Sequence, residues 1–135
     1  MSPDLKRVVA EILAGIEGPD GLENARCNLT TLPETLPFVA AAYHLEPDAR
    51  RRESIIYCLW QFRDPVALPT LAAALHDREE RVWKEALDGV VALGGPAALR
   101  VLDEARAAFQ DGPGVRLRKE WIDEAIGQMG GPRFS

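Results

Sequence analysis

Two histidines occupy the same place in two copies of one short motif. They are the only histidines in the chain, and they end the nonamers LPFVAAAYH (from Leu36 to His44) and LPTLAAALH (from Leu68 to His76). Histidine is a common metal ligand and general base. A histidine–zinc bond is about 2.1 Å long, whereas neighbouring helical motifs lie roughly 10 Å apart. We therefore interpret both histidines as structural residues at helix ends, where the helix dipole is negative.

The remaining reactive residue types form no catalytic pattern. Cys58 lies between Ile55 and Leu59 at helix-interior spacing, which indicates a small buried apolar group. Glycine pairs end helical segments rather than following strands, so no phosphate-binding loop is predicted. Carboxylate pairs such as Glu79 and Glu80 are frequent on exposed helix faces. We expect no catalytic residue, no metal site and no cofactor.

Composition limits the class of protein. The chain has 135 residues, 47% hydrophobic and 27% charged, with a formal net charge of -5 and a pI near 5.1. This length can bury a core without disulfides or metal. Nucleic-acid binding requires a basic surface, so an acidic chain suits a basic protein partner better. Without a signal-peptide pattern or a run near the roughly 18 apolar residues of a membrane span, we expect a cytoplasmic protein with no membrane contact.

The nonamers belong to a repeat of about 32 residues. Pro33, Pro65 and Pro96 each open a copy, and proline is well tolerated in the first turn of a helix. The second half of each copy has apolar residues at helical spacing; in the middle copy these are Val82, Ala86, Val90 and Leu93. Gly94-Gly95 then ends that helix. The pattern predicts helix pairs at 33–64, 65–95 and 96–131, the third lengthened through Phe109–Gly114.

One further helix is expected ahead of the repeats. Its apolar stripe runs from Leu5 to Ile16, with Ser2-Pro3 as its start and Gly18-Pro19 as its stop. Residues 1–32 would then form a capping helix on the first repeat and a turn-rich connector at 19–32. Within the repeats, Asp48 and Asp77 are expected to be helix N-caps.

The repeat resembles HEAT repeats, specifically the short bacterial HEAT-like type first noted in phycobilin (PBS) lyases. DPVALPTL at Asp64–Leu71 and VWKEALDGVVALG at Val82–Gly94 carry the likeness, which covers roughly residues 33–130. It implies an all-α fold, a short right-handed superhelix of three helix pairs plus the N-terminal capping helix, in one domain. Two departures are Trp83, where the family usually has arginine, and Arg63, where it has a terminal glycine.

In stacks of this type the second helix of each pair lines the concave surface, which is the expected binding face. Its exposed positions combine an aromatic pair with a carboxylate cluster. The predicted partner-binding residues are Glu53, Tyr57 and Trp60 in the first pair, Arg81, Lys84, Asp88 and Val91 in the second, and Glu120, Asp123 and Glu124 in the third. In the alternative interpretation, Tyr57 and Trp60 pack between repeats and the acids only keep the chain soluble.

Three consecutive arginines, Arg50-Arg51-Arg52, begin the second helix of the first pair, where cations oppose the helix dipole. We interpret them as partners of Asp77, Glu79 and Glu80 in the next repeat. A contact with an anion or phosphate is the alternative.

These observations favour a non-catalytic protein–protein interaction module that binds a basic protein as a monomer or weak homodimer. Small acidic HEAT-like proteins include immunity proteins that neutralise basic bacterial toxins, and the resemblance makes such a role our narrower prediction. Other HEAT-like proteins are lyases or DNA glycosylases. A lyase-like or chaperone subunit for a tetrapyrrole protein and a DNA-repair protein therefore stay open as alternatives.

Overall fold

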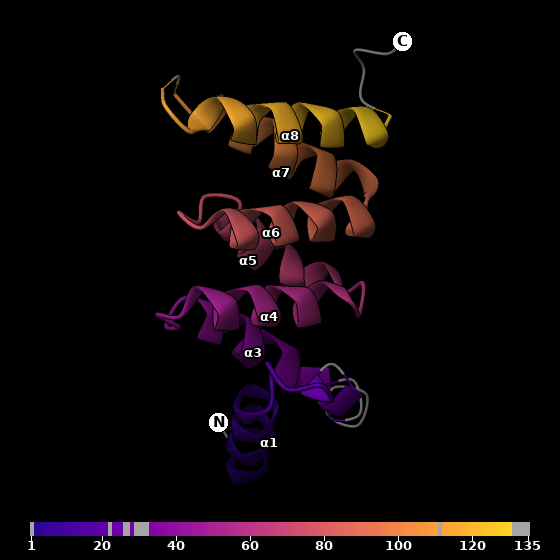
Figure 1. Ribbon diagram of the computed structural model, residues 1–135. Coiled ribbons are helices and arrows are strands. Elements are labelled where there is room, and N and C mark those ends of the chain that lie inside the picture. The colour runs from indigo at the N-terminus through magenta and orange to yellow at the C-terminus, as the bar shows by residue number, and fades with distance from the viewer. Residues whose placement is uncertain (1, 22, 26–27, 29–32, 111, 131–135) are drawn as a thin grey trace.

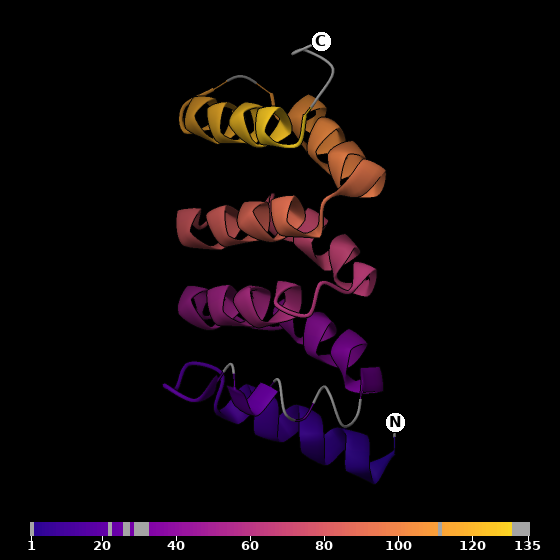
Figure 2. The ribbon, with the colours of Figure 1, turned by 90° about the vertical axis from the view of Figure 1, so that its right-hand side faces the viewer.

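The helices follow one another in pairs, and the pairs stack along one direction (Figure 1). The computed structural model describes residues 2–21, 23–25, 28, 33–110 and 112–130. The pairs are α3 (Leu36–Tyr43) with α4 (Ala49–Trp60), α5 (Leu68–Ala74) with α6 (Glu80–Leu93), and α7 (Gly95–Ala108) with α8 (Val115–Gln128). Figure 2 shows α4, α6 and α8 along one side of the stack and α3, α5 and α7 along the other. The predicted all-α fold of three helix pairs is confirmed.

The helix starts follow from proline and aspartate. The 3₁₀ turns η1 (Pro33–Thr35) and η2 (Pro65–Ala67) lead into α3 and α5, so each proline lies where no intrahelical N–H is needed. The Asp48 carboxylate accepts a hydrogen bond from the Arg50 N–H at 2.9 Å, which confirms Asp48 as the N-cap of α4.

A residue with positive φ follows each of the three second helices, and after α8 it is Gly130 with φ 73°. Gly94 ends α6 with φ 65°, a conformation in which glycine carries no steric penalty. Arg63 adopts φ 54° shortly after α4, at the position where the family has glycine. Its guanidinium lies 4.9 Å from the Trp60 ring centroid and donates to the Trp60 carbonyl at 3.0 Å, and these contacts oppose the backbone strain.

The prediction that Asp77 is an N-cap was wrong. The N-cap of α6 is Glu79, whose side chain makes no capping hydrogen bond. Asp77 lies two residues earlier and accepts a hydrogen bond from the Glu79 N–H at 2.9 Å. Its carboxylate is also held by Arg52 and Tyr43 of the preceding pair, which fixes Asp77 in the loop before the helix.

The core follows the predicted helical periodicity. Ile55 and Leu59 of α4, Val82 and Val90 of α6, and Ile122 of α8 are all fully buried. Each second helix therefore directs one apolar stripe into the stack and leaves its opposite side for solvent. Of the described helices, none combines the length and apolar character that a membrane crossing requires.

Helix α1 (Pro3–Ala14) lies at one end of the stack, in contact with α3 (Figure 1). Its start is as predicted, because Ser2 Oγ accepts a hydrogen bond from the Leu5 N–H at 3.2 Å. The helix stops at Ala14, before the predicted Gly18-Pro19 stop, since the chain turns at Gly15 and Gly18. In the predicted connector 19–32, residues 21, 23–25 and 28 are helical, and 22, 26–27 and 29–32 lie outside the described residues.

Candidate functional site

Helices α4, α6 and α8 lie side by side along one side of the stack, and we call their outer side the second-helix face (Figure 1). Their apolar stripes are buried, so the positions on the other side of each helix form this surface. Predicted site residues that the structure brings together on it are Glu53 and Tyr57 from α4, Arg81, Lys84 and Asp88 from α6, and Glu124 from α8. Glu120 instead pairs with Arg116 and lines a hollow with Arg106 of α7.

Three more predicted residues have environments of their own. The indole of Trp60 lies between α4 and α6, where its Nε1 donates to Glu85 at 2.8 Å. Asp123 turns toward α7 and pairs with Arg106 at 2.9 Å. Val91 is half-buried and packs against the core, and its remaining surface lines a hollow with Asp88 and Glu124. The interpretation that an aromatic residue packs between repeats is therefore correct for Trp60, whereas Tyr57 is 38% exposed.

A first hollow lies between the turn after α1 and helices α4 and α6, and we call it the N-terminal cleft. It measures about 450 Å³ and is lined by Ile16, Glu17, Gly18, Pro19, Glu53, Ser54, Tyr57, Cys58 and Glu85. Burial raises the pKa of Glu85, and the nearby charges of Asp88 and Glu53 raise it further, while the hydrogen bond from Trp60 opposes them. Glu85 thus lies near two other carboxylates, Glu53 in the same cleft and Asp88 outside it.

A second, smaller hollow lies between α6 and α8, and we call it the α6–α8 cleft. It measures about 140 Å³ and is lined by Leu87, Asp88, Val91, Trp121, Glu124, Ala125 and Gln128. Trp121 is 37% exposed, and Lys84 Nζ lies 4.3 Å from the centroid of its ring. Burial raises the pKa of Asp88.

The cations of the second-helix face are already paired. Arg81 Nη1 lies 3.7 Å from Glu53 Oε1, and Lys84 Nζ lies 3.1 Å from Glu80 Oε1. Among the residues that the structure describes, no ion pair reaches Glu85, Asp88 or Glu124. The face therefore carries negative charge that the described part of the chain does not neutralise.

Sequence reasoning missed Glu17, Glu85 and Trp121. Trp121 falls on the same side of its helix as Glu124 and Gln128, so a helical wheel of α8 could have found it. Glu85 precedes Asp88 by three residues on α6, so a helical wheel of α6 could have found it in the same way. Glu17 has none, because its place beside α4 depends on how the chain turns after α1.

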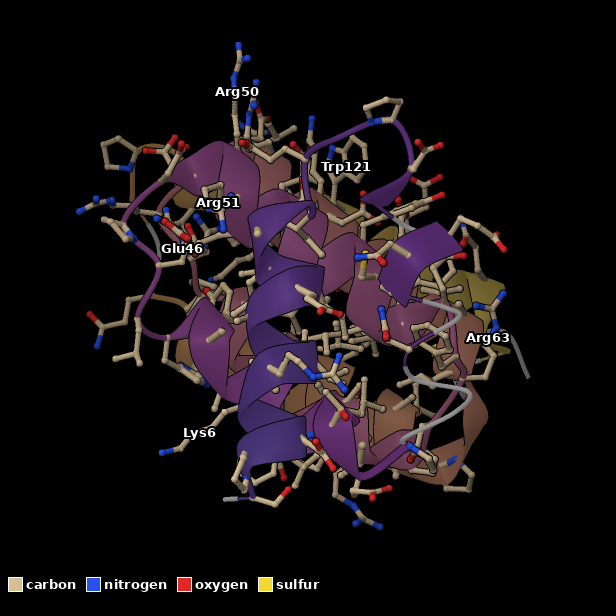
Figure 3. All side chains as sticks on the ribbon, turned by 90° about the horizontal axis from the view of Figure 1, so that it is seen from below. Lys6, Glu46, Arg50, Arg51, Arg63 and Trp121 are labelled. Carbon is tan, nitrogen blue, oxygen red and sulfur yellow. The ribbon has the colours of Figure 1, made fainter. Side chains whose placement is uncertain are left out.

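Two arginines of the run, Arg51 and Arg52, act within the stack. Arg52 donates to both oxygens of Asp77, at 2.9 and 3.2 Å, which confirms the predicted pairing for Asp77. The predicted pairing with Glu80 was wrong, because Glu80 pairs with Lys84 of its own helix. Arg51 instead pairs with Glu46 at 2.8 Å and donates to the Leu13 carbonyl of α1. Figure 3 shows Arg51 directed toward Glu46 and Arg50 directed away from the protein.

The two histidines lie at helix ends, as predicted. His44 is the C-cap of α3, with its ring edge-on to Tyr43 at 5.0 Å. His76 stacks on Phe109 at 4.7 Å, and burial and the nearby Arg118 lower its pKa. Burial raises the pKa of Cys58 to about 11. A search of the described residues finds no group of three or more His, Cys, Asp or Glu side chains arranged to hold a metal ion.

Comparison with known proteins adds two findings. A family model described as HEAT repeats matches residues 35–120. Among curated proteins, deoxyhypusine hydroxylase of Rattus norvegicus is 28% identical over 116 residues, which cover 76% of this chain and 37% of that protein. The chain thus corresponds to little more than a third of that relative's length. No solved structure matches.

Proposed function

Because the chain belongs to the HEAT-repeat family, whose repeats form protein-interaction and scaffold modules, we propose that it binds a basic protein through its second-helix face and performs no catalysis. Helical stacks of this kind offer extended surfaces rather than single pockets. Three helices side by side span about 30 Å, which is enough for a standard interface of roughly 800 Å² per partner.

One observation carries this proposal: three carboxylates without an ion pair among the described residues lie beside exposed rings, Glu85 with Tyr57 in the N-terminal cleft, and Asp88 and Glu124 with Trp121 in the α6–α8 cleft. A carboxyl group whose pKa is raised by folding favours the fold when protonated and opposes it when ionised. Burial thus makes the charged form of Glu85 less favourable in the folded protein, and the hydrogen bond from Trp60 offsets only part of this effect. A partner's cations would offset this cost, and exposed aromatic residues are frequent anchors of protein interfaces.

The overall charge supports the same partner. The chain has a net charge of -5, and an acidic surface raises the rate of encounter with a basic protein by about 10- to 1,000-fold at low salt. This acidity disfavours the DNA-repair alternative, since a DNA-binding groove must be basic. The hydroxylase named among the relatives is a longer protein, and our proposal does not extend its activity to this chain.

The test compares two variants of equal charge in binding to a fluorescein-labelled hexalysine peptide, followed by fluorescence anisotropy. The first variant removes three acids of the face, through Glu85→Gln, Asp88→Asn and Glu124→Gln. The control removes three exposed acids elsewhere, through Glu34→Gln, Asp103→Asn and Glu104→Gln. We expect the first to weaken binding by about tenfold and the control by about twofold or less, because only the first removes charges that the ligand contacts.

Equal losses in the two variants would mean that hexalysine senses only net charge, and would refute the proposed face. The same proteins then serve as bait in an extract of the native host. A basic protein retained by the wild type and the control, but lost with the face variant, would be the partner.

The narrower role of toxin-neutralising immunity stays a prediction. It requires that the partner be a toxin and that co-expression of this chain restore growth to cells that make the toxin. The tetrapyrrole alternative requires an absorbance band in the visible range when the protein is mixed with a bilin.

A further inference from the structure

We propose that the α6–α8 cleft receives a single lysine or arginine side chain of the basic partner. This inference rests on the proposed function and specifies it, because it names the residue type that the partner inserts and the position where it docks.

The size of the cleft fits one side chain. Its volume of about 140 Å³ is well below the roughly 300–1,000 Å³ of pockets that hold whole small-molecule ligands. The cleft is too small for a helix or a folded loop, but a single extended side chain can enter it. The partner's backbone would then lie across α6 and α8, within reach of the rest of the second-helix face.

The walls of the cleft match the two parts of a long basic side chain. Leu87, Val91 and Ala125 line it with apolar atoms, against which the methylene groups of lysine or arginine can pack. Asp88 and Glu124 line the same cleft and supply negative charge for the head group. A purely apolar side chain would leave these carboxylates without a counter-charge, and an acidic one would be repelled.

Trp121 adds a cation-binding surface. The chain's own Lys84 already places its ammonium group 4.3 Å from the centroid of this ring, a distance at which the ring attracts a cation. The same indole lines the cleft. Lys84 does not line the cleft, so an incoming ammonium or guanidinium would meet the indole from the cleft and not at the position that Lys84 occupies.

The N-terminal cleft fits a single basic side chain less well. It is larger, at about 450 Å³, and two of its three carboxylates already have partners: Glu53 pairs with Arg81, and Glu85 accepts the Trp60 N–H. In the α6–α8 cleft, Asp88 and Glu124 have no ion-pair partner among the described residues.

The test uses NMR on ¹⁵N-labelled protein, in which the indole N–H signal of Trp121 is assigned with Trp121→Phe. The probe is the peptide acetyl-Gly-Gly-Lys-Gly-Gly-amide, and its match carries norleucine in place of lysine. We expect the lysine peptide to shift the Trp121 signal in a saturable way and the norleucine peptide to leave it in place. The double variant Asp88→Asn with Glu124→Gln should weaken binding of the lysine peptide by about tenfold, and Glu53→Gln should leave this binding unchanged.

Two results would overturn the inference: an equal shift with norleucine, or unchanged lysine binding in the double variant. Titration of the same samples with hexalysine separates this failure from that of the proposed function. If hexalysine binds through the face acids while the Trp121 signal stays fixed, the cleft is wrong and the binding face stands. If hexalysine does not bind, both are wrong. Thermal unfolding of each variant verifies that it is folded.

Discussion

A single carboxylate joins the first two helix pairs. Asp77, in the loop before α6, accepts hydrogen bonds from the Tyr43 hydroxyl at 2.6 Å and from Arg52 at 2.9 and 3.2 Å. The side chains of Arg52 and Asp77 are only 9% and 6% exposed. Removing one member of such a buried pair leaves the other charge without compensation, which costs more than the pair itself contributes.

We therefore predict that Asp77→Asn lowers the free energy of unfolding by about 3 kcal/mol at pH 7, as measured by urea denaturation. Burial raises the pKa of Asp77, but the hydrogen bonds from Arg52, Tyr43 and the Glu79 N–H outweigh it and lower the pKa overall. The stabilisation is thus present above the ordinary carboxyl pKa and is lost as the pH falls through the lowered one. The difference between variant and wild type should shrink over that acidic range.

The control is the double variant Arg52→Met with Asp77→Leu, which removes both charges at once. Its loss of stability should be smaller than the sum of the losses in the single variants Arg52→Met and Asp77→Leu. Additive losses would show that the pair does not act as a unit.

Sequence reasoning found this pair but mistook the role of Asp77. Three arginines that oppose a helix dipole require acidic partners, and this argument led to Asp77. The sequence equally suggested an N-cap, because Asp77 precedes a helix. It could not show that the Tyr43 hydroxyl, 34 residues earlier, donates to the same carboxylate that Arg52 holds.

At the scale of elements, α4 and α6 approach closely because Gly89 has no side chain. A Cβ atom at Gly89 would lie 2.8 Å from Cδ1 and Cγ of Trp60 and 2.9 Å from its Cβ. Real Cβ atoms do not approach that closely, so the indole would have to move. The same indole donates to Glu85, so a displacement would also disturb the N-terminal cleft.

Gly89→Ala should therefore destabilise the protein by about 1–3 kcal/mol, the usual cost of overpacking. On a free helix surface the same change would add up to about 1 kcal/mol of stability, so the sign of the effect tests the packing. Thermal or urea unfolding measures it. In a Trp60→Ala background, which removes Cγ and Cδ1 and leaves only the Cβ contact, the penalty should be clearly smaller. A stability gain from Gly89→Ala alone would contradict the contact.

The two junctions between helix pairs use different chemistry. Trp83 on α6 occupies the slot that Arg52 fills on α4, and this was one of the departures from the family pattern. At the second junction, the Arg118 guanidinium lies 5.0 Å from the Trp83 ring centroid and 4.9 Å from that of Phe109. Arg118 also donates to the Leu75 carbonyl at 3.0 Å. A cation held between aromatic rings thus replaces the ion pair of the first junction.

At the scale of the molecule, the repeat predicted the stack and the second-helix face but not the clefts. The 32-residue spacing and the helical apolar stripes are local signals, and they suffice to place α4, α6 and α8 side by side. The clefts combine side chains from separate elements, such as Glu17 after α1 with Tyr57 of α4, or Asp88 of α6 with Trp121 of α8. Their shape depends on how the elements pack, which composition and spacing do not specify.

In a linear stack, each helix pair is stabilised by its own core and by its immediate neighbours. The last pair supports this view, because α7 and α8 are joined by the Arg106–Asp123 ion pair and α8 carries the exposed Arg116–Glu120 pair. Weakening one junction should then loosen the helices between that junction and the nearer end of the stack more than the helices on its other side. Asp77 lies at the junction nearest to α1, and Arg118 lies at the junction nearest to α8.

We predict that Asp77→Asn accelerates amide hydrogen exchange mainly in α1, α3 and α4, by roughly tenfold or more, with a smaller effect in α7 and α8. Arg118→Met should reverse this pattern, because it loosens α7 and α8 from α5 and α6. Hydrogen–deuterium exchange followed by mass spectrometry, under conditions where both variants stay folded, compares the two directly. Equal acceleration in all helices of either variant would mean that the stack opens as one cooperative unit, and the junctions would then not act independently.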